Sequence, residues 1–524
     1  MKLAPRTVFR IVLAAAGVGW FGWTYFHPGG LRTDTAVSPA ASDEAAATGV
    51  PQKPRTWRLG SLTLTACELP QPHTGLSSAA WCAPFEVPEN RADPHSRRIS
   101  LNLAVIRSAA QLPAKDMVVL LAGGPGQAAT ESWPSVANAL DPLLAHRNVL
   151  LLDQRGTGHS NPLSCKGPEQ AATDEKVGFD PEALRAETAR CLQQVQTRAD
   201  PRYYTTTMAV QDLEDVRRAL DSPRFDLIGV SYGTRVAQQY AMHHPDAIRS
   251  LVLDGVVPNP LVLGEDFAQN LDAALKLQFA RCTAQPACKA RFGDPYQTLY
   301  QLRDALRANP HKVSFRDPQS YQSVQRVLSE DSLASVVRMF AYTPITAALL
   351  PLSIDAAAHG DVGPLLGQAK LLQGDLVDSM DGGMQSSVIC SEDADLLRPR
   401  PQDEDTILGT RMITALQAVC TVWPRGTRPA DFHQPLRSAT PALLLSGQYD
   451  PVTPPAYGEA VLKGLADARH LVLKGQGHNV MGAGCAPRLV KKFIEDLQPK
   501  ALDASCLDRL QAPPLFIDFN GSTP

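Results

Sequence analysis

The central part of the chain alternates short apolar runs with polar stretches of helical spacing. Seven apolar runs follow one another, reading ISLNLAVI, MVVLL, NVLLL, FDLIGV, SLVLD, PALLL and RHLVL. The stretch MAVQDLEDVRRAL, between the third and fourth runs, has the periodicity of an amphipathic helix. This alternation predicts βαβ units on a largely parallel sheet, and the near-continuous apolar strands indicate that helices cover both of its faces.

A long segment without this alternation separates the fifth run from the sixth. Residues 259–437 are rich in Leu and Ala at helical spacing, as in DFAQNLDAALKLQFARC and SLASVVRMFA, and show no comparable strand pattern. We therefore expect an α/β fold whose core, formed by residues 57–258 and 438–524, is interrupted by a mainly helical cap insertion at 259–437.

The amino terminus differs in composition from the rest of the chain. Three basic residues precede an apolar run at 11–26, and the stretch that follows is rich in Ala, Ser, Pro and Gly. A basic start followed by an apolar run is typical of an export signal, whether cleaved or kept as an anchor. We expect residues 1–30 to be a signal peptide or an N-terminal membrane anchor and residues 31–56 to be a linker. The remainder is then periplasmic or secreted.

Composition limits the class of partner. The 524 residues are 44% hydrophobic and 20% charged, with a formal net charge of −3 and a pI near 6.5. A chain without a large basic field is poorly suited to nucleic acid or to an anionic membrane surface as its main partner. We therefore expect a small-molecule or peptide substrate, with any membrane attachment confined to the N-terminal segment.

The ten cysteines fit an exported chain, because thiols outside the cytoplasm usually form disulfides. No two of them have the C-x-x-C spacing of metal ligands, so we expect no metal site. The sequence does not determine their connectivity. Pairing neighbours along the chain gives Cys67 with Cys82, Cys165 with Cys191, Cys282 with Cys288, Cys390 with Cys420, and Cys485 with Cys506.

One motif predicts a catalytic nucleophile. Residues 229–233 read Gly-Val-Ser-Tyr-Gly and lie between the run FDLIGV and the helical stretch TRVAQQYAMHH. In a nucleophile elbow the serine occupies a strained strand-to-helix turn, and the flanking glycines allow neighbouring backbone to pack closely. The setting argues against a chance match, so Ser231 is the predicted nucleophile of a serine hydrolase.

A serine hydroxyl needs a base and a group that orients the base, and in hydrolases with this elbow both follow the serine in the chain. Asp450 ends the strand-like PALLLSGQY, and His478 follows LVLKGQG in the same way. We predict that these two residues complete a catalytic triad. Asp254 is the rival acid because it also ends an apolar run, whereas His470 precedes its strand and is interpreted as structural.

Acyl transfer also needs donors aimed at the developing oxyanion. The run MVVLL leads into a glycine-rich loop at 123–126, where backbone can approach a substrate without an intervening side chain. We assign one donor to the amide of Gly124 and the other to the amide of Tyr232, the residue after the nucleophile. A phosphate-binding loop is the alternative, but the Lys-Ser/Thr ending and the G-x-G-x-x-G spacing are both missing.

Several motifs together resemble the proline iminopeptidase and tripeptidyl aminopeptidase family of α/β-hydrolases. They are AGGPGQ, DQRGTGHS, GVSYGT and GQYDPVTP, and residues 423–506 resemble the carboxyl-terminal region of the tripeptidyl aminopeptidases. The resemblance implies the α/β-hydrolase fold and release of amino-terminal residues or tripeptides from peptides, without a cofactor. Ala122 stands where the iminopeptidase signature has histidine, which favours the tripeptidyl branch.

Two charged pairs remain. Asp153 and Arg155 end a strand, where a charged turn is more often a structural ion pair than a substrate contact. Glu392 and Asp393 lie in the insertion, and the resembling family uses glutamates of its cap to hold the substrate's amino terminus. A carboxylate binds an ammonium group through a charge-assisted hydrogen bond, so both are candidates for substrate amine binding, although paired acids are usually a solvated face.

Three functions are compatible with these features. The first is an aminopeptidase that acts outside the cytoplasm, and the second is a carboxylic-ester hydrolase with the same triad, because the fold does not determine the substrate. The third is a catalytically silent binding protein. The predicted triad and the glycine loop argue against the third.

Overall fold

The computed structural model describes residues 55–70, 76–164, 180–318, 320–378 and 380–522. The expected export segment and almost all of the expected linker lie outside these ranges, as does Cys165. Within the described ranges, no helix is both long enough and apolar enough to span a membrane.

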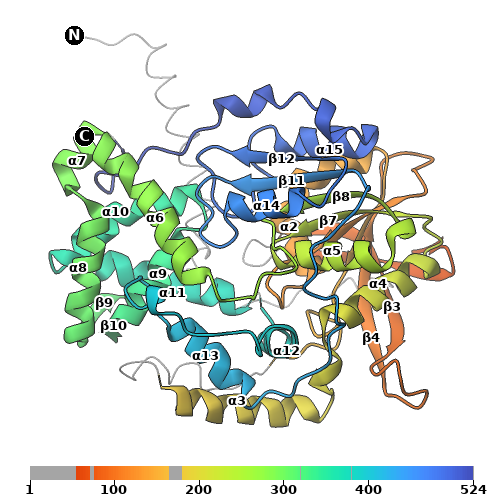
Figure 1. Ribbon diagram of the computed structural model, residues 1–524, viewed down its shortest axis with the longest axis horizontal. Helices are drawn as coiled ribbons and strands as arrows, with labels where there is room; N and C mark the ends of the chain where they lie inside the picture. Colours follow the sequence, from red (N-terminus) through yellow and green to blue (C-terminus); the bar gives the residue numbers. More distant parts are fainter. Residues whose placement is uncertain (1–54, 71–75, 165–179, 319, 379, 523–524) are drawn as a thin grey trace, which may run out of the picture.

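A ten-stranded sheet forms the centre of the molecule (Figure 1). Its parallel part comprises β6 (Val149–Leu152), β5 (Met117–Leu121), β7 (Phe225–Val230), β8 (Ile248–Asp254), β11 (Ala442–Gly447) and β12 (Ala468–Leu473), in this order. Every residue of β5, β6 and β11 is buried. Strands of this kind are covered on both faces, so the predicted parallel sheet is confirmed.

The other edge of the sheet is antiparallel. It comprises β1 (Thr56–Leu59), β2 (Leu62–Pro70), β3 (Ser77–Pro88) and β4 (Arg98–Ile106). The sequence pattern predicts β4 but not the three strands before it. Their residues are partly exposed, and they therefore lack the continuous apolar runs of the parallel strands.

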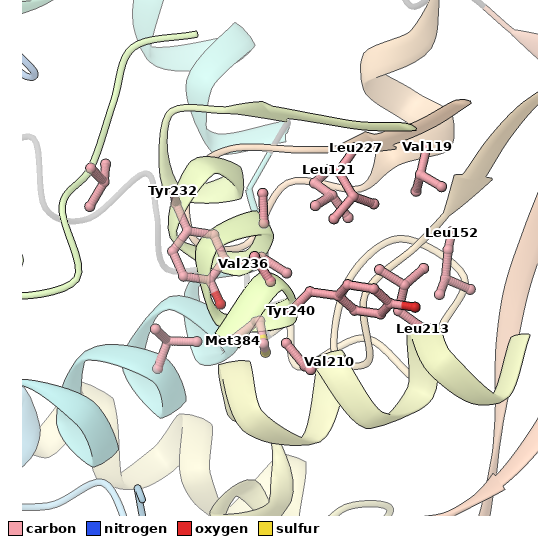
Figure 2. Close-up of a cluster of buried hydrophobic side chains, with 14 of the residues drawn as sticks. Val119, Leu121, Leu152, Val210, Leu213, Leu227, Tyr232, Val236, Tyr240 and Met384 are labelled. Carbon is pink, nitrogen blue, oxygen red and sulfur yellow. The ribbon is translucent and has the colours of Figure 1, made fainter. Parts of the chain in front are cut away.

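Helices pack on both faces of the sheet. Along β5, Val118 and Leu120 belong to one apolar cluster, whereas Val119 and Leu121 belong to another. The first cluster includes α2 (Ala129–Leu140) and α15 (Ala486–Asp496), and the second includes α4 (Thr206–Ala219), α5 (Tyr232–His243) and α14 (Pro455–Leu462). Figure 2 shows part of the second cluster, where side chains of α4 and α5 meet the strands.

Between β8 and β11 the chain is mainly helical. Its helices are α6 (Phe267–Ala284), α7 (Pro286–Phe292), α8 (Pro295–Ala308), α9 (Glu330–Phe340), α10 (Pro344–Ala358), α11 (Gly363–Asp378), α12 (Gly382–Glu392) and α13 (Arg411–Cys420). A hairpin of β9 (His311–Arg316) and β10 (Ser323–Leu328) lies among them. The sequence pattern predicts the helices but not the hairpin, because its strands are mostly polar and half exposed.

Most of these helices share an apolar cluster of their own, to which Leu271 of α6 and Leu333 of α9 belong. Helix α12 differs, because its Met384 and Val388 belong to the cluster beneath α4 and α5. Helix α13 in turn packs against α3 (Pro181–Gln196). Ile413 and Cys420 of α13 belong to the same cluster, so α12 and α13 are the helices of this segment that join the core of the sheet.

Four of the five predicted cysteine pairs are confirmed. The disulfides join Cys67 to Cys82, Cys282 to Cys288, Cys390 to Cys420, and Cys485 to Cys506. The fifth predicted pair includes Cys165 and lies outside the described residues.

Candidate active site

Ser231 lies at the turn between β7 and α5, with φ 54° and ψ −121°. A positive φ in a residue other than glycine is strained and persists only where the surroundings enforce it. The surroundings are tight here, because a β-carbon on Gly233 would lie 2.1 Å from the carbonyl oxygen of Leu121. A β-carbon on Gly229 would lie 2.5 Å from the carbonyl oxygen of Gly233. Both positions flanking the serine therefore require glycine, as the motif predicts.

The backbone on both sides of Ser231 is fixed by hydrogen bonds. Its N–H donates to the carbonyl of Asp254 at 2.8 Å, and its carbonyl accepts from the N–H and the hydroxyl of Thr234 at 2.9 and 2.6 Å. The same hydroxyl accepts from the N–H of Val257 at 2.8 Å. The serine is thereby tied to β8 and to the loop that follows it.

Asp450 lies in the loop after β11, and both of its carboxylate oxygens accept hydrogen bonds. Its Oδ1 accepts from the amides of Val452 and Thr453, both at 2.8 Å. Its Oδ2 accepts from the Thr453 hydroxyl at 2.9 Å and lies 2.8 Å from Nδ1 of His478. An ionised carboxylate can only accept a hydrogen bond from the imidazole of His478. Nδ1 therefore carries the proton, and Nε2 is left as the base.

His478 follows β12, and its side chain is almost fully buried. Burial lowers the pKa of its imidazole, but the charge and hydrogen bond of Asp450 raise it by more, with a smaller contribution from Asp254. The net pKa lies above the ordinary value. The predicted acid and base are therefore brought together, and the rival Asp254 is not in contact with Nδ1.

The mainly helical segment contacts this base directly. The N–H of His478 donates to the carbonyl of Tyr342 at 2.7 Å, and the two rings meet edge to face with centroids 5.4 Å apart. Sequence reasoning missed Tyr342, because nothing in its neighbourhood signals a contact with a distant loop. Thr453 was also missed, although an aspartate followed at the third position by threonine is a recognisable turn signal.

The glycine loop after β5 packs against the nucleophile. A β-carbon on Gly123 would lie 3.2 Å from Cβ of Ser231, and Gly124 has φ 105°. Tyr232 is the first residue of α5, so its N–H has no acceptor within the helix. The predicted donors, the amides of Gly124 and Tyr232, thus belong to the two segments that meet at the serine. In the described part of the chain the hydroxyl of Ser231 makes no hydrogen bond, as is common in free enzymes.

Glu392 ends α12 and is fully buried. Its Oε1 accepts from the N–H of Thr206 at 2.6 Å, and its Oε2 accepts from the Thr206 hydroxyl at 2.9 Å. That hydroxyl lies 2.6 Å from the phenolic oxygen of Tyr232, so Glu392 is linked through one residue to the nucleophile elbow. Figure 2 shows Tyr232 turned toward the helix that carries Met384. Burial raises the pKa of Glu392 to about 8, although the Thr206 amide opposes this.

Asp393 has a different environment from its neighbour. It is also fully buried, but its Oδ2 pairs with the guanidinium of Arg235 at 2.9 Å. Its other oxygen lies 3.7 Å from Nε2 of His433 and has no hydrogen-bond partner. The charge of Asp393 is therefore neutralised within the protein. Among the described residues, Glu392 has no such cation in contact with its carboxylate.

Asp153 and Arg155 of DQRGTGHS are both buried and bond to other segments of the core, although not to each other. Asp153 accepts from the amide of Thr130 and from the side chain of Asn102, both at 2.9 Å. Arg155 forms a bidentate pair with Asp212 at 2.6 and 2.7 Å, and both side chains are buried. His470 likewise bonds to neighbouring side chains away from the triad.

Comparisons with known proteins give a family and several relatives. A sequence model of the family described as alpha/beta hydrolase fold matches residues 116–482. The chain is 25% identical over 298 residues to the serine protease Hip1 of Mycobacterium tuberculosis, a match that covers 53% of this chain and 56% of that protein. It is 27% identical over 198 residues to the tripeptidyl aminopeptidase of Streptomyces lividans, covering 34% and 35% respectively.

The putative hydrolase YuaR of Escherichia coli is 27% identical over 237 residues, covering 43% of this chain and 46% of that protein. The chain thus spans about half the length of YuaR and Hip1 and about a third of the tripeptidyl aminopeptidase. Among solved structures, the proline iminopeptidase of Mycobacterium smegmatis is 17% identical with a TM-score of 0.39, covering 79% of this chain and 98% of that one.

Proposed function

Because the chain belongs to the α/β-hydrolase fold family, we propose that it is a serine hydrolase with Ser231 as nucleophile, His478 as general base and Asp450 as the orienting acid. The observation that carries this proposal is the 2.8 Å contact between Asp450 and Nδ1 of His478. This contact is found in the same molecule as a strained serine on a strand-to-helix turn.

The mechanism follows from these contacts. Nε2 of His478 removes the proton of Ser231 as Oγ attacks the substrate carbonyl, and Asp450 stabilises the imidazolium that forms. The amides of Gly124 and Tyr232 donate to the oxyanion of the tetrahedral intermediate. His478 then protonates the leaving amine, and water regenerates the serine from the acyl-enzyme by the same route in reverse. No cofactor takes part in this scheme.

We propose peptides as the substrate and release of amino-terminal residues or tripeptides as the reaction. Two relatives bear the names serine protease and tripeptidyl aminopeptidase, which supports the choice. Glu392 is the preferred residue for binding the substrate's α-ammonium, with Asp393 second, because Asp393 already has Arg235 as a partner. The Thr206 hydroxyl occupies only one acceptor position on Oε2, and a carboxylate oxygen can accept a second hydrogen bond from an ammonium group.

We also propose that the protein acts outside the cytoplasm, periplasmic or secreted, with residues 1–30 as signal or anchor. The four described disulfides support this location. In the proposed domain arrangement, residues 259–437 form a cap over a core made of residues 57–258 and 438–524. The contact between Tyr342 and His478 supports a cap that adjoins the catalytic base.

Two measurements test the function. A fluorophosphonate probe should label the wild-type protein at Ser231 and leave Ser231→Ala unlabelled. A panel of p-nitroanilides of single amino acids and free tripeptides, together with p-nitrophenyl butyrate, then separates aminopeptidase from esterase. We expect the highest kcat/KM on a tripeptide p-nitroanilide. Hydrolysis of the ester alone would favour the carboxylic-ester hydrolase, and absence of labelling would contradict the serine hydrolase.

A further inference from the structure

Asp254 is a buried carboxylate that the mechanism above does not use. It is the last residue of β8 and is 1% exposed. Its Oδ1 accepts from the amide of Val480 and its Oδ2 from the amide of Met481, both at 2.9 Å. Both donors lie in the loop between β12 and α15, which also carries His478. The two oxygens of this carboxylate accept hydrogen bonds from two consecutive backbone amides, and these bonds fix the path of the loop.

The backbone of the same residue holds the nucleophile. The carbonyl of Asp254 accepts from the N–H of Ser231 at 2.8 Å. The next residue, Gly255, lies against the base, since a β-carbon there would be 3.0 Å from Cε1 of His478. One residue is thus bonded to the elbow through its carbonyl and to the histidine loop through its side chain.

We propose that Asp254 is a positioning residue that sets the placement of His478 relative to Ser231. The proposal rests on the proposed serine hydrolase function. The two catalytic side chains come from loops that are 247 positions apart in the chain, and Asp254 is bonded to both loops. A displacement of about 1 Å in such a geometry costs on the order of 100-fold in rate.

Asp254 also acts on the base through its charge. The titratable groups that face Asp254 are His478 and Asp450. His478 in turn faces the two carboxylates, Asp450 and Asp254. It also contacts Thr453 and Tyr342, which are uncharged. Burial raises the pKa of Asp254 to about 6, opposed by its two amide bonds, so it is an anion at neutral pH. Its negative charge helps to raise the pKa of His478. Removing that charge should therefore lower the pKa of the base.

The test compares Asp254→Asn with Asp226→Asn. Asp226 is a matched control because it is also fully buried in the sheet, and burial raises its pKa to about 6 as well. It bonds to Ser250 and Arg249 and lies five residues before the nucleophile, roughly 16 Å along the strand. Circular dichroism and thermal melting first establish that each variant is folded.

We expect Asp254→Asn to lose roughly 10-fold to 100-fold in kcat on the best p-nitroanilide, with KM changed less than about threefold. The acid limb of its kcat/KM profile should move to lower pH, because an imidazole of lower pKa stays neutral down to a lower pH. Labelling of Ser231 by the fluorophosphonate should slow in parallel. Asp226→Asn should keep the wild-type kcat and acid limb.

Equal kcat and equal acid limbs in the two variants would overturn the positioning role while leaving the hydrolase intact, provided that wild type is labelled. If wild type is not labelled, the proposed function itself fails. Should Asp254→Asn not fold, Asp254→Glu takes its place, since it keeps the charge but lengthens the side chain. Its acid limb should stay at the wild-type pH while kcat falls, and an unchanged kcat would overturn the proposal.

Discussion

At the scale of single residues, the strain at Ser231 belongs to the backbone and not to the hydroxyl. Its positive φ is imposed by the close packing of Gly229 and Gly233, which alanine at position 231 would leave in place. Ser231→Ala should therefore abolish turnover yet keep the wild-type melting temperature and substrate binding. A residual rate above that of water is expected from the oxyanion hole. Turnover of the variant close to wild type would contradict the assigned nucleophile.

The role proposed for Glu392 is tested by blocking the substrate's amine. The ammonium of a free substrate can form a charge-assisted hydrogen bond with Glu392, whereas an acetylated terminus cannot, so a free tripeptide p-nitroanilide should be cleaved roughly 30-fold faster or more than its acetylated form. Glu392→Gln keeps the size of the side chain and removes its charge. It should shrink this preference, mainly by slowing cleavage of the free-amine substrate.

Asp395→Asn supplies the control, because Asp395 follows the same helix but is half exposed and paired with Arg428. The free-amine preference should survive in this variant.

Because burial raises the pKa of Glu392 to about 8, its carboxyl is mainly protonated at pH 7, and a bound ammonium should expel that proton. Calorimetry of Ser231→Ala with a tripeptide amide, in buffers of different ionisation enthalpy, should show proton release. A preference that persists in Glu392→Gln would exclude Glu392 and make Asp393 the next residue to test.

Residues that follow strands could be predicted from the sequence, and residues that complete their environment could not. Ser231, Asp450 and His478 each end or follow an apolar run, which puts them at one edge of a parallel sheet. The contact of Tyr342 with His478 depends on how a separate helical segment is placed, which no local pattern encodes. The sequence also names Asp254 as a rival acid, and only the three-dimensional structure shows its bonds to the loop amides.

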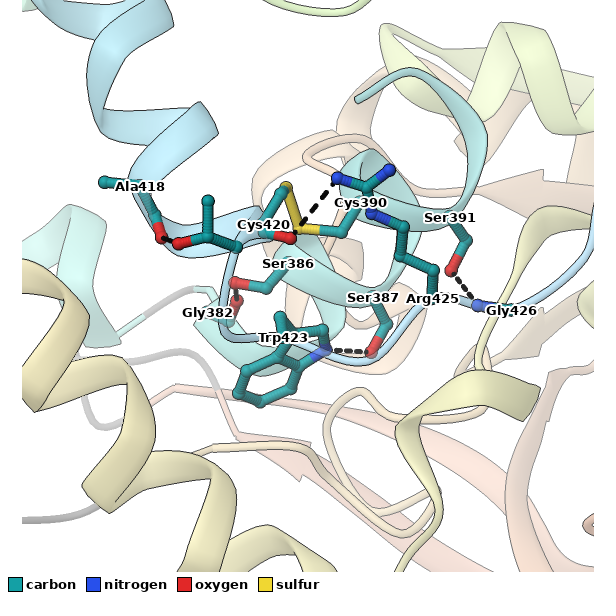
Figure 3. The surroundings of a disulfide bond; sticks show 11 residues. Gly382, Ser386, Ser387, Cys390, Ser391, Ala418, Cys420, Trp423, Arg425 and Gly426 are labelled. Carbon is teal, nitrogen blue, oxygen red and sulfur yellow. Dashed lines mark hydrogen bonds between the residues drawn. A yellow bond between two sulfur atoms is a disulfide. The ribbon is translucent and has the colours of Figure 1, made fainter. Parts of the chain in front are cut away.

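At the scale of elements, helix α12 is held by a disulfide and by hydrogen bonds from the chain that follows α13. Figure 3 shows the disulfide from Cys390 to Cys420 together with two hydrogen bonds from the chain after α13. The indole N–H of Trp423 donates to Ser387, and the amide of Gly426 donates to Ser391, at 2.9 and 2.8 Å. These bonds hold the helix end that presents Glu392.

Removing the disulfide by Cys390→Ser with Cys420→Ser should loosen this end. Closing a loop of 30 residues stabilises a chain by roughly 3–4 kcal/mol, so the melting temperature should fall. KM for free tripeptide substrates should rise, while hydrolysis of p-nitrophenyl butyrate, which has no ammonium group to bind, should change little.

The double variant Cys282→Ser with Cys288→Ser is the matched control. That disulfide spans only six residues and joins α6 to α7, so its loss should cost roughly 2 kcal/mol and leave KM unchanged. An equal rise of KM in both double variants would show that the effect is global and not specific to α12.

Which elements could be predicted depended on how deeply each is buried. The strands β5, β6, β7, β8 and β11 are almost wholly buried, and their continuous apolar runs are visible in the sequence. The strands β2 and β3 of the antiparallel part of the sheet and the hairpin of β9 and β10 are partly exposed, so their residues mix polar and apolar types. Their pairing is set by neighbours that are distant in the sequence.

At the scale of the whole molecule, the disulfides connect segments that are close in the sequence. Each of the four described bonds joins cysteines no more than 30 positions apart, and no cysteine in the described ranges is free. Alkylation of the denatured, unreduced protein with iodoacetamide should therefore modify few of the ten cysteines. Mass spectrometry that finds most of them modified would contradict the proposed location outside the cytoplasm.

The hydrogen bond between the His478 amide and the Tyr342 carbonyl uses no side chain of the helical segment. Every amino acid carries this carbonyl, so the hydrogen bond itself makes no demand on the residue type at position 342, where only the ring packing on His478 favours an aromatic residue. The hydrogen bond demands only that the backbone return to the same point. We expect related chains to vary in amino-acid type elsewhere along this segment, and to gain or lose residues in it, while the position where it meets the base is kept.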